Sequence, residues 1–253
     1  MSDSKSNLKL RLHQGYGFLL FLWRLNWFKT LRLNFTLLPF SQAIQFPIFV
    51  FGPLYVGSLK GKLRIEAPLK AGMIGIGQHY ESRRRHAGIA QFTLLGTLVV
   101  KGRAFFGIDT EVYIGPSATL TMANYARLNS RGRLLCYSSI YIGQYVACGF
   151  ESVVTDSHFH ALITSEGERS ETISPIYIAD YNYIGHRVSV MPGTHTSPYT
   201  TIGSLSMTNK DYRSEGSNVL LAGVPAKVVR RNIARDFEGE MQWLNEWFSP
   251  FNK

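Results

Sequence analysis

The side chains best suited to acid–base chemistry in this chain lie together in one short polar segment, Asp156-Ser157-His158-Phe159-His160. A neutral imidazole can take a proton from a hydroxyl group at physiological pH, because the ordinary pKa of histidine lies just below that pH. From residue type alone, either His158 or His160 could be such a base. Four further histidines stand in no motif, and we interpret them as structural or exposed: His13, His79, His86 and His195.

Around this segment, aliphatic or small residues recur at every sixth position from Ile142 to Ile202, often with glycine next to them. This period fits neither a helix nor an alternating strand. It is typical of a parallel β-helix, in which each sextet forms a short strand and a corner. Three sextets make one coil, so residues eighteen positions apart should lie one above another. We therefore expect Ile184 beside Ile202 and His186 beside Ser204.

The repeat starts weakly at Leu63 and becomes clear from Ile108. It slips by four residues around 127–135, where we expect a small bulge. A polar stretch at 156–174, rich in histidine and then in acidic residues and serine, interrupts it, and we interpret this stretch as a loop that leaves one corner of the coil. Loops on rigid scaffolds often carry chemistry. We place a β-helix domain at 63–227, with this loop inserted.

Two flanking regions, 1–62 and 228–253, complete the chain. In the first we expect an amphipathic helix over 8–33 and an extended, proline-punctuated segment over 34–60. In the second, apolar residues at helical spacing predict a C-terminal helix over 228–248 that caps or crosses the coil stack, because open β-helix ends expose unpaired strand edges. The expected fold class is all-β.

The composition narrows the classes of function. With 45% hydrophobic and 17% charged residues, the chain is not an intrinsically disordered protein. The formal net charge of +10 indicates an acidic partner. However, the basic residues are spread over several segments, and no nucleic-acid-binding motif is present, so we expect no nucleic acid among the partners.

Only two cysteines occur, Cys136 and Cys148, and both fall on the inward position of the repeat. We interpret them as small core residues in a reducing compartment. The sequence contains no CxxC or HExxH motif and no cluster of histidine and cysteine. We therefore expect no metal ion.

Two features bear on membranes. No cleavable signal peptide is visible, and the uncharged tract at 34–59 is interrupted by prolines, so we expect no spanning helix and a cytoplasmic location. Between Trp23 and Arg32, however, aromatic residues alternate with cations. This pattern is typical of a helix lying at the inner face of a membrane. Packing of the same aromatic face on the domain is the alternative.

The sextets, together with Leu221-Ala222-Gly223-Val224-Pro225-Ala226-Lys227, resemble the left-handed β-helix acyltransferases with hexapeptide repeats. Within that superfamily the chain is most similar to the O-acetyltransferases of capsule, O-antigen and exopolysaccharide biosynthesis. The resemblance covers roughly 63–232. It implies left-handed coiling, acetyl-CoA as co-substrate, and a homotrimer whose active sites lie between neighbouring coils.

The resemblance also implies roles for single residues. The family's Asp-x-Asp-x-His segment falls on 156–160, which makes His160 the catalytic base, puts His158 where the family has an aspartate, and lets Asp156 orient the ring. Tyr183 stands in place of a tryptophan that lines the acceptor site. Further positions match those that meet the coenzyme: Ser204 and His186 along the pantetheine arm, and Lys210, Lys227 and Arg230 at the phosphates.

We expect direct transfer of an acetyl group from acetyl-CoA to a hydroxyl of a glycan or of its lipid-linked precursor. Holding the donor and the acceptor together would supply much of the rate gain without a covalent enzyme intermediate. Two alternatives stay open. The same base could acetylate an amino sugar on nitrogen, or the β-helix could be a non-catalytic scaffold or membrane-surface module.

Overall fold

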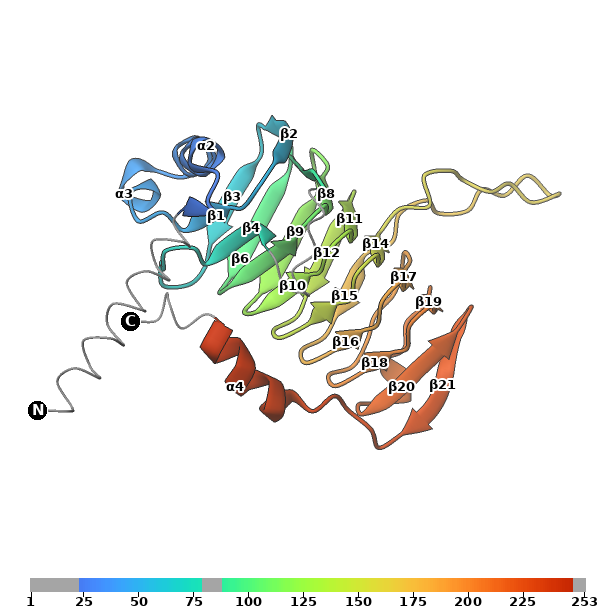
Figure 1. The fold of residues 1–253 in the computed structure, drawn as a ribbon. Coiled ribbons are helices and arrows are strands. Elements are labelled where there is room, and N and C mark those ends of the chain that lie inside the picture. Colours follow the sequence, from blue (N-terminus) through green and yellow to red (C-terminus); the bar gives the residue numbers. More distant parts are fainter. Residues whose placement is uncertain (1–22, 79–87, 248–253) are drawn as a thin grey trace, which may run out of the picture.

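The structure, a computed structural model, describes residues 23–78 and 88–247. Successive strands pass in turn to three parallel sheets that form the sides of a coil stack (Figure 1). The expected all-β, left-handed parallel β-helix is confirmed. At its end the first sheet changes direction, since β21 pairs antiparallel with β20.

The three sheets contain the following strands. The first sheet consists of β1 (Ile48–Val50), β4 (Ile74–Gln78), β7 (Ala104–Gly107), β10 (Ala126–Leu128), β13 (Ala147–Cys148), β16 (Tyr183–Ile184), β18 (Thr201–Ile202), β20 (Val219–Gly223) and β21 (Ala226–Arg231). The second sheet consists of β2 (Leu54–Leu59), β5 (Ala90–Leu94), β8 (Glu111–Ile114), β11 (Arg133–Cys136), β14 (Val153–Thr155), β17 (Ser189–Val190) and β19 (Met207–Thr208). The third sheet consists of β3 (Lys62–Ile65), β6 (Thr97–Lys101), β9 (Thr119–Ala123), β12 (Ser139–Ile142) and β15 (Ile176–Ile178).

The coil length explains where the sextet pattern is clear. Ile184 pairs with Ile202, so this coil has the expected eighteen residues. Earlier coils are longer, for example twenty residues between the partners Arg127 and Ala147. Strands β10 and β11 pair with their neighbours without a register shift. The bulge expected at 127–135 is therefore absent from these strands. The earlier coils instead have strands of three to five residues, β5 to β12, where β16 to β19 have two.

The core is the inside of the stack. Cys136 and Cys148 are buried there as free thiols, in line with their inward positions in the repeat. The last coils have a more polar interior, in which the buried Asn182 side chain donates to Thr196 Oγ1 and accepts from the backbone N–H of Thr200. These bonds satisfy polar groups that burial alone would destabilise.

The flanks differ from expectation at their boundaries. Strands β1 and β2 belong to the first coil, although their residues fall in the expected extended segment. Three α-helices are described: α2 (Trp27–Leu37), α3 (Phe40–Ala43) and α4 (Phe237–Trp247), with a 3₁₀ turn, η1 (Arg213–Glu215). Residues 8–22 of the expected N-terminal helix lie outside the described residues. At the other end, β21 occupies the start of the expected helix, so α4 begins only at Phe237.

A ladder of tyrosines at one corner positions α4. Tyr145 and Tyr181 stack with ring centroids 5.7 Å apart, and both have positive φ, which is uncommon outside glycine. Phe237, the first residue of α4, packs edge-on against both rings at 4.5 and 4.8 Å. The helix thereby lies along the outside of the stack (Figure 1).

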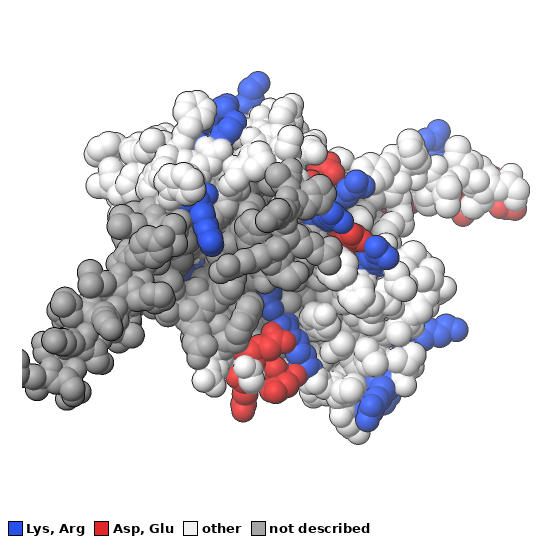
Figure 2. All heavy atoms as spheres, in the orientation of Figure 1, with Lys and Arg blue, Asp and Glu red and all other residues white. Residues whose placement is uncertain are grey.

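Two surface features follow. Lys and Arg side chains are scattered over the face in Figure 2 and form no single tract, as the sequence indicates. Within residues 23–78 and 88–247, no helix combines the length and the apolar character needed to cross a membrane.

Candidate functional site

The insertion after β14 forms a hairpin-like arm, residues 156–175, that projects from the corner between the second and third sheets (Figure 1). Its outgoing and returning segments are joined by backbone hydrogen bonds, from the N–H of His158 to Thr172 O at 2.8 Å and from the N–H of Ser170 to Leu162 O at 2.9 Å. Antiparallel bridges join its two halves. The segment that carries both candidate bases is therefore an ordered element.

His158 and His160 lie near the root of this arm, and both are exposed. Between them Phe159 adopts a φ of +62°, and its ring packs edge-on against Tyr137 at 5.4 Å. This contact ties the histidine turn to the coil. Within the described part of the chain, neither imidazole makes a hydrogen bond or an ion pair, so both are accessible to a substrate.

Asp156 has a different place from the one expected. It is fully buried, and its carboxylate accepts hydrogen bonds from the backbone N–H groups of Tyr137, Ser138 and Ser139 at 2.7, 2.7 and 2.9 Å. These bonds close the corner between β11 and β12 under the arm. Among the described contacts, none joins Asp156 to either histidine ring, so its observed role is to anchor the root of the arm.

A second group of predicted residues gathers at the corner between the first and second sheets. Ser204 Oγ lies 3.1 Å from His186 Nδ1, which confirms that these residues are neighbours in successive coils. The His186 ring also stacks on Phe150 at 4.8 Å. Lys227 lies two strands further, opposite Ala222 in the β20–β21 hairpin, about 10 Å from Ser204 by strand spacing. We call His186, Ser204 and Lys227 the His186 corner.

The two other predicted basic residues lie elsewhere. Lys210 follows β19, at the corner from which the arm projects, and its Nζ lies 5.3 Å from the Tyr212 ring centroid. Arg230 pairs with Leu220, near the start of β20, whereas Lys227 lies near the end of that strand. Both are exposed. In one chain the three predicted phosphate-binding cations therefore do not converge on one point.

The arm follows the C-terminal ends of the strands of the second sheet, whereas the His186 corner precedes their N-terminal ends. Crossing that sheet takes about six extended residues, or roughly 20 Å. One chain therefore does not place His160 directly beside Ser204.

Tyr183 lies on the first sheet, beneath the segment that leads to α4. The Arg235 guanidinium sits 5.0 Å from the Tyr183 ring centroid and forms an ion pair with Glu240, which also contacts Arg127 at 3.4 Å. Burial, and then the charge of Arg127, lower the pKa of Arg235 to about 10. The predicted acceptor-binding ring is therefore half covered by the chain's own C-terminal segment.

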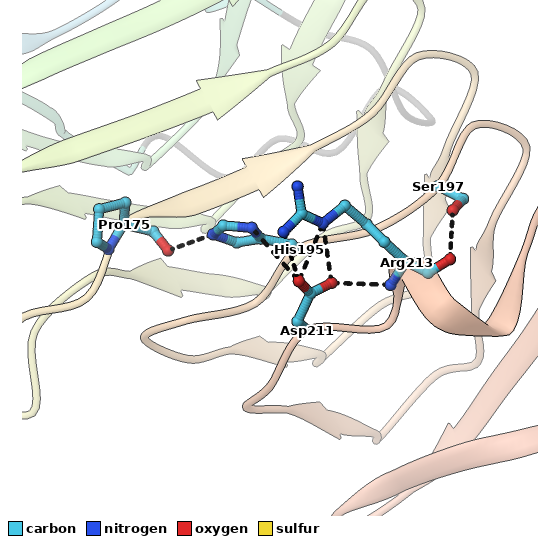
Figure 3. A network of polar contacts seen from close by, with 5 residues as sticks. All are labelled: Pro175, His195, Ser197, Asp211 and Arg213. Atoms are coloured by element: carbon cyan, nitrogen blue, oxygen red, sulfur yellow. Dashed lines mark hydrogen bonds and ion pairs between the residues drawn. The ribbon is translucent and has the colours of Figure 1, made fainter.

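A polar network at the root of the arm escaped the sequence interpretation (Figure 3). His195 Nε2 lies 3.2 Å from the carbonyl oxygen of Pro175, the last residue of the arm, and Nδ1 lies 4.0 Å from Asp211. Arg213 donates to both oxygens of Asp211, and these hydrogen bonds are the main cause that lowers the pKa of Asp211 to about 2.

A signal for this network was present in the sequence. His195 lies eighteen positions after Tyr177, which is one coil length, and the structure pairs the two residues. The eighteen-residue register therefore places His195 beside β15 in the next coil, near the point where the arm returns to the stack. The described residues contain no group of three His, Cys, Asp or Glu side chains able to hold a metal ion.

No protein-family model matches the chain, and no curated protein matches it in sequence. Among solved structures, the polysialic acid O-acetyltransferase OatWY is 16% identical, with a TM-score of 0.44 over 76% of this chain and 98% of that one. The polySia-specific acetyltransferase NeuO is 17% identical, with a TM-score of 0.38 over 80% and 94%. AntD, an N-acyltransferase from Bacillus cereus in complex with dTDP and 3-hydroxybutyryl-CoA, is 13% identical, with a TM-score of 0.37 over 81% and 89%. These similarities are weak, so the function rests on the residues of this chain.

Proposed function

We propose that this protein is an acetyl-CoA-dependent O-acetyltransferase that acts in the cytoplasm on a hydroxyl of a glycan or of its lipid-linked precursor. The main support is the His186 corner. There the coil stack brings Ser204, His186 and the Ala222–Lys227 hairpin into one row, in the order that the resemblance assigns to coenzyme binding.

His160 acts as the base in this proposal. Its neutral imidazole takes the proton of the acceptor hydroxyl, and the hydroxyl oxygen attacks the thioester carbonyl carbon. A backbone N–H of the rigid coil stabilises the oxyanion that forms. When the carbon–sulfur bond breaks, the imidazolium returns its proton and coenzyme A leaves as the thiol. The solvent exposure of His160 supports this role, since the acceptor must reach the ring.

The donor is held at the His186 corner of a neighbouring copy. Lys227 contacts its phosphates by charge-assisted hydrogen bonds, and Arg230 and Lys210 extend the positive surface on either side. The roughly 20 Å between the two corners supports a site shared by two copies of a homotrimer. Tyr183 contacts the acceptor through the part of its ring that Arg235 leaves open.

The test is transfer of labelled acetyl from acetyl-CoA to a panel of polysaccharides and nucleotide sugars, including polysialic acid and a dTDP-linked amino sugar. We expect an alkali-labile ester product from the wild type. His160→Ala should lower kcat by about 10²- to 10⁴-fold, whereas the matched variant His158→Ala should change it only a few-fold.

Three results would contradict this proposal. Equal activity of wild type and His160→Ala would remove His160 as the base. An alkali-stable product would establish N-acetylation in place of O-acetylation. Absence of both acetyl transfer and thioester hydrolysis in the wild type would favour a non-catalytic scaffold.

A further inference from the structure

Helix α2 docks on the coil stack through Leu33 and through two polar side chains. Thr30 and Asn34 are fully buried on the side that faces β1. Asn34 donates to the carbonyl oxygen of Ile48 at 2.8 Å and accepts from its N–H at 3.1 Å, while Thr30 Oγ1 accepts from the N–H of Val50 at 3.1 Å. The two side chains thus provide hydrogen-bond partners for backbone groups of β1, the outermost strand of the first sheet. These bonds also fix how the helix is rotated about its axis.

The opposite face of the helix is also largely apolar, and it is exposed. Leu33 packs into the core, whereas the side of a surface helix that points to solvent is usually polar. The Phe28 side chain is 71% exposed and Phe40, at the start of α3, is 73% exposed. We call the whole set the aromatic surface: Trp23, Trp27, Phe28, Leu31, Phe35, Phe40 and Ile44.

The charges within and beside helix α2 have one sign. Residues 23–59 contain three cations and no aspartate or glutamate: Arg24, Lys29 and Arg32. Arg24 and Arg32 are exposed beside the aromatic surface. Figure 2 shows the end of the molecule that carries α2 and α3 as white and blue, with the acidic groups of that view located further along the stack. A partner for this surface must therefore combine an apolar layer with negative charge.

We propose that the aromatic surface docks on an anionic lipid bilayer, with its aromatic side chains at the headgroup level and the flanking cations on the lipid phosphates. Tryptophan and phenylalanine beside lysine and arginine suit this interface. The helices lie at the N-terminal end of the stack, whereas β20 and β21 lie at the other end (Figure 1). Docking therefore leaves the His186 corner away from the bilayer. This inference does not depend on the chemistry proposed above.

The first experiment is sedimentation of the full chain with vesicles of phosphatidylcholine, alone or with about 30% phosphatidylglycerol. We expect binding to the anionic vesicles, weakened by salt. Phe28→Ser/Phe40→Ser should lower the partition coefficient at least about tenfold. A matched control, Leu205→Ser/Val229→Ser, removes apolar groups that are 66% and 59% exposed at the other end of the stack and should change it less than about twofold.

A charge variant tests the second component separately. Arg24→Gln/Arg32→Gln keeps the apolar side chains and should lower the partition coefficient about 30-fold on anionic vesicles, with little effect on neutral ones. It also tests the proposal should the phenylalanine variant fail to fold. Equal binding to neutral and anionic vesicles, or an equal loss in the control, would overturn the proposal. So would a phenylalanine variant that keeps its lipid binding but loses oligomers, which would assign the surface to a second copy.

Discussion

At the scale of single residues, His195 and Asp156 both hold the root of the arm in place. The sequence interpretation assigned this role to neither residue. The carboxylate of Asp156 bonds to the backbone of residues 137–139 in the preceding coil, and His195 contacts Pro175. Both contacts depend on how a corner closes. The spacing of a repeat gives the neighbours along a sheet but not those at a corner of variable length. By contrast, the contact of His186 with Ser204 follows directly from the eighteen-residue register.

The network around Asp211 should give a measurable acid dependence. Its folded-state pKa is lowered from 3.8 to about 2, chiefly by Arg213, so the stabilisation is present above pH 3.8 and is lost as the pH falls toward 2. The carboxylate is 46% exposed, so the effect on the melting temperature should be small. Thermal melts of wild type and Asp211→Asn should differ near neutral pH and converge near pH 2. An unchanged difference at both pH values would refute the assignment.

The two cysteines should be inert in the folded protein. Burial raises the pKa of Cys148 to about 12 and also raises that of Cys136, so neither thiol forms a reactive thiolate near neutral pH. We expect no reaction with a thiol reagent at pH 8 until denaturant is added, and then two equivalents. Rapid labelling of the native protein would show that the inward position predicted from the repeat is wrong.

At the scale of elements, the clear sextets predicted the later coils well, because an eighteen-residue coil leaves no freedom in its register. The sequence interpretation missed β1 and β2 because the first coils are longer than eighteen residues, so the sextet spacing does not mark them. It also missed β21, whose pairing with β20 covers a sheet edge that the periodicity does not reveal. Because β21 takes up residues at the start of the expected C-terminal helix, α4 begins later than the sequence predicts.

The arm's attachment can be tested through Asp156. In Asp156→Asn an amide NH₂ replaces one acceptor oxygen and faces backbone N–H donors, so buried hydrogen bonds are lost. We expect the free energy of unfolding in urea to fall by about 2–4 kcal/mol. His158→Ala, an exposed change in the same arm, is the matched control and should leave it nearly unchanged. If Asp156→Asn kept its stability but altered the pH profile of acetyl transfer, Asp156 would instead orient a histidine.

At the scale of the whole molecule, the fold separates the two parts of the proposed site. The arm and the His186 corner lie at opposite ends of the strands of the second sheet, while the segment leading to α4 covers part of the first sheet beside Tyr183. The resemblance to a trimeric superfamily and the separation of the corners therefore lead to the same expectation, that one copy supplies the base and the next supplies the donor site.

Mixing two inactive variants tests this expectation most directly. His160→Ala lacks the base, and Ser204→Trp fills the His186 corner with a bulky ring at an exposed position. Each homotrimer should be nearly inactive in acetyl transfer. When the two variants are unfolded and refolded together in equal amounts, random assembly should restore about a quarter of the wild-type activity, because that share of the shared sites receives both intact parts. Activity no higher than the average of the two parents would contradict a site built by two copies.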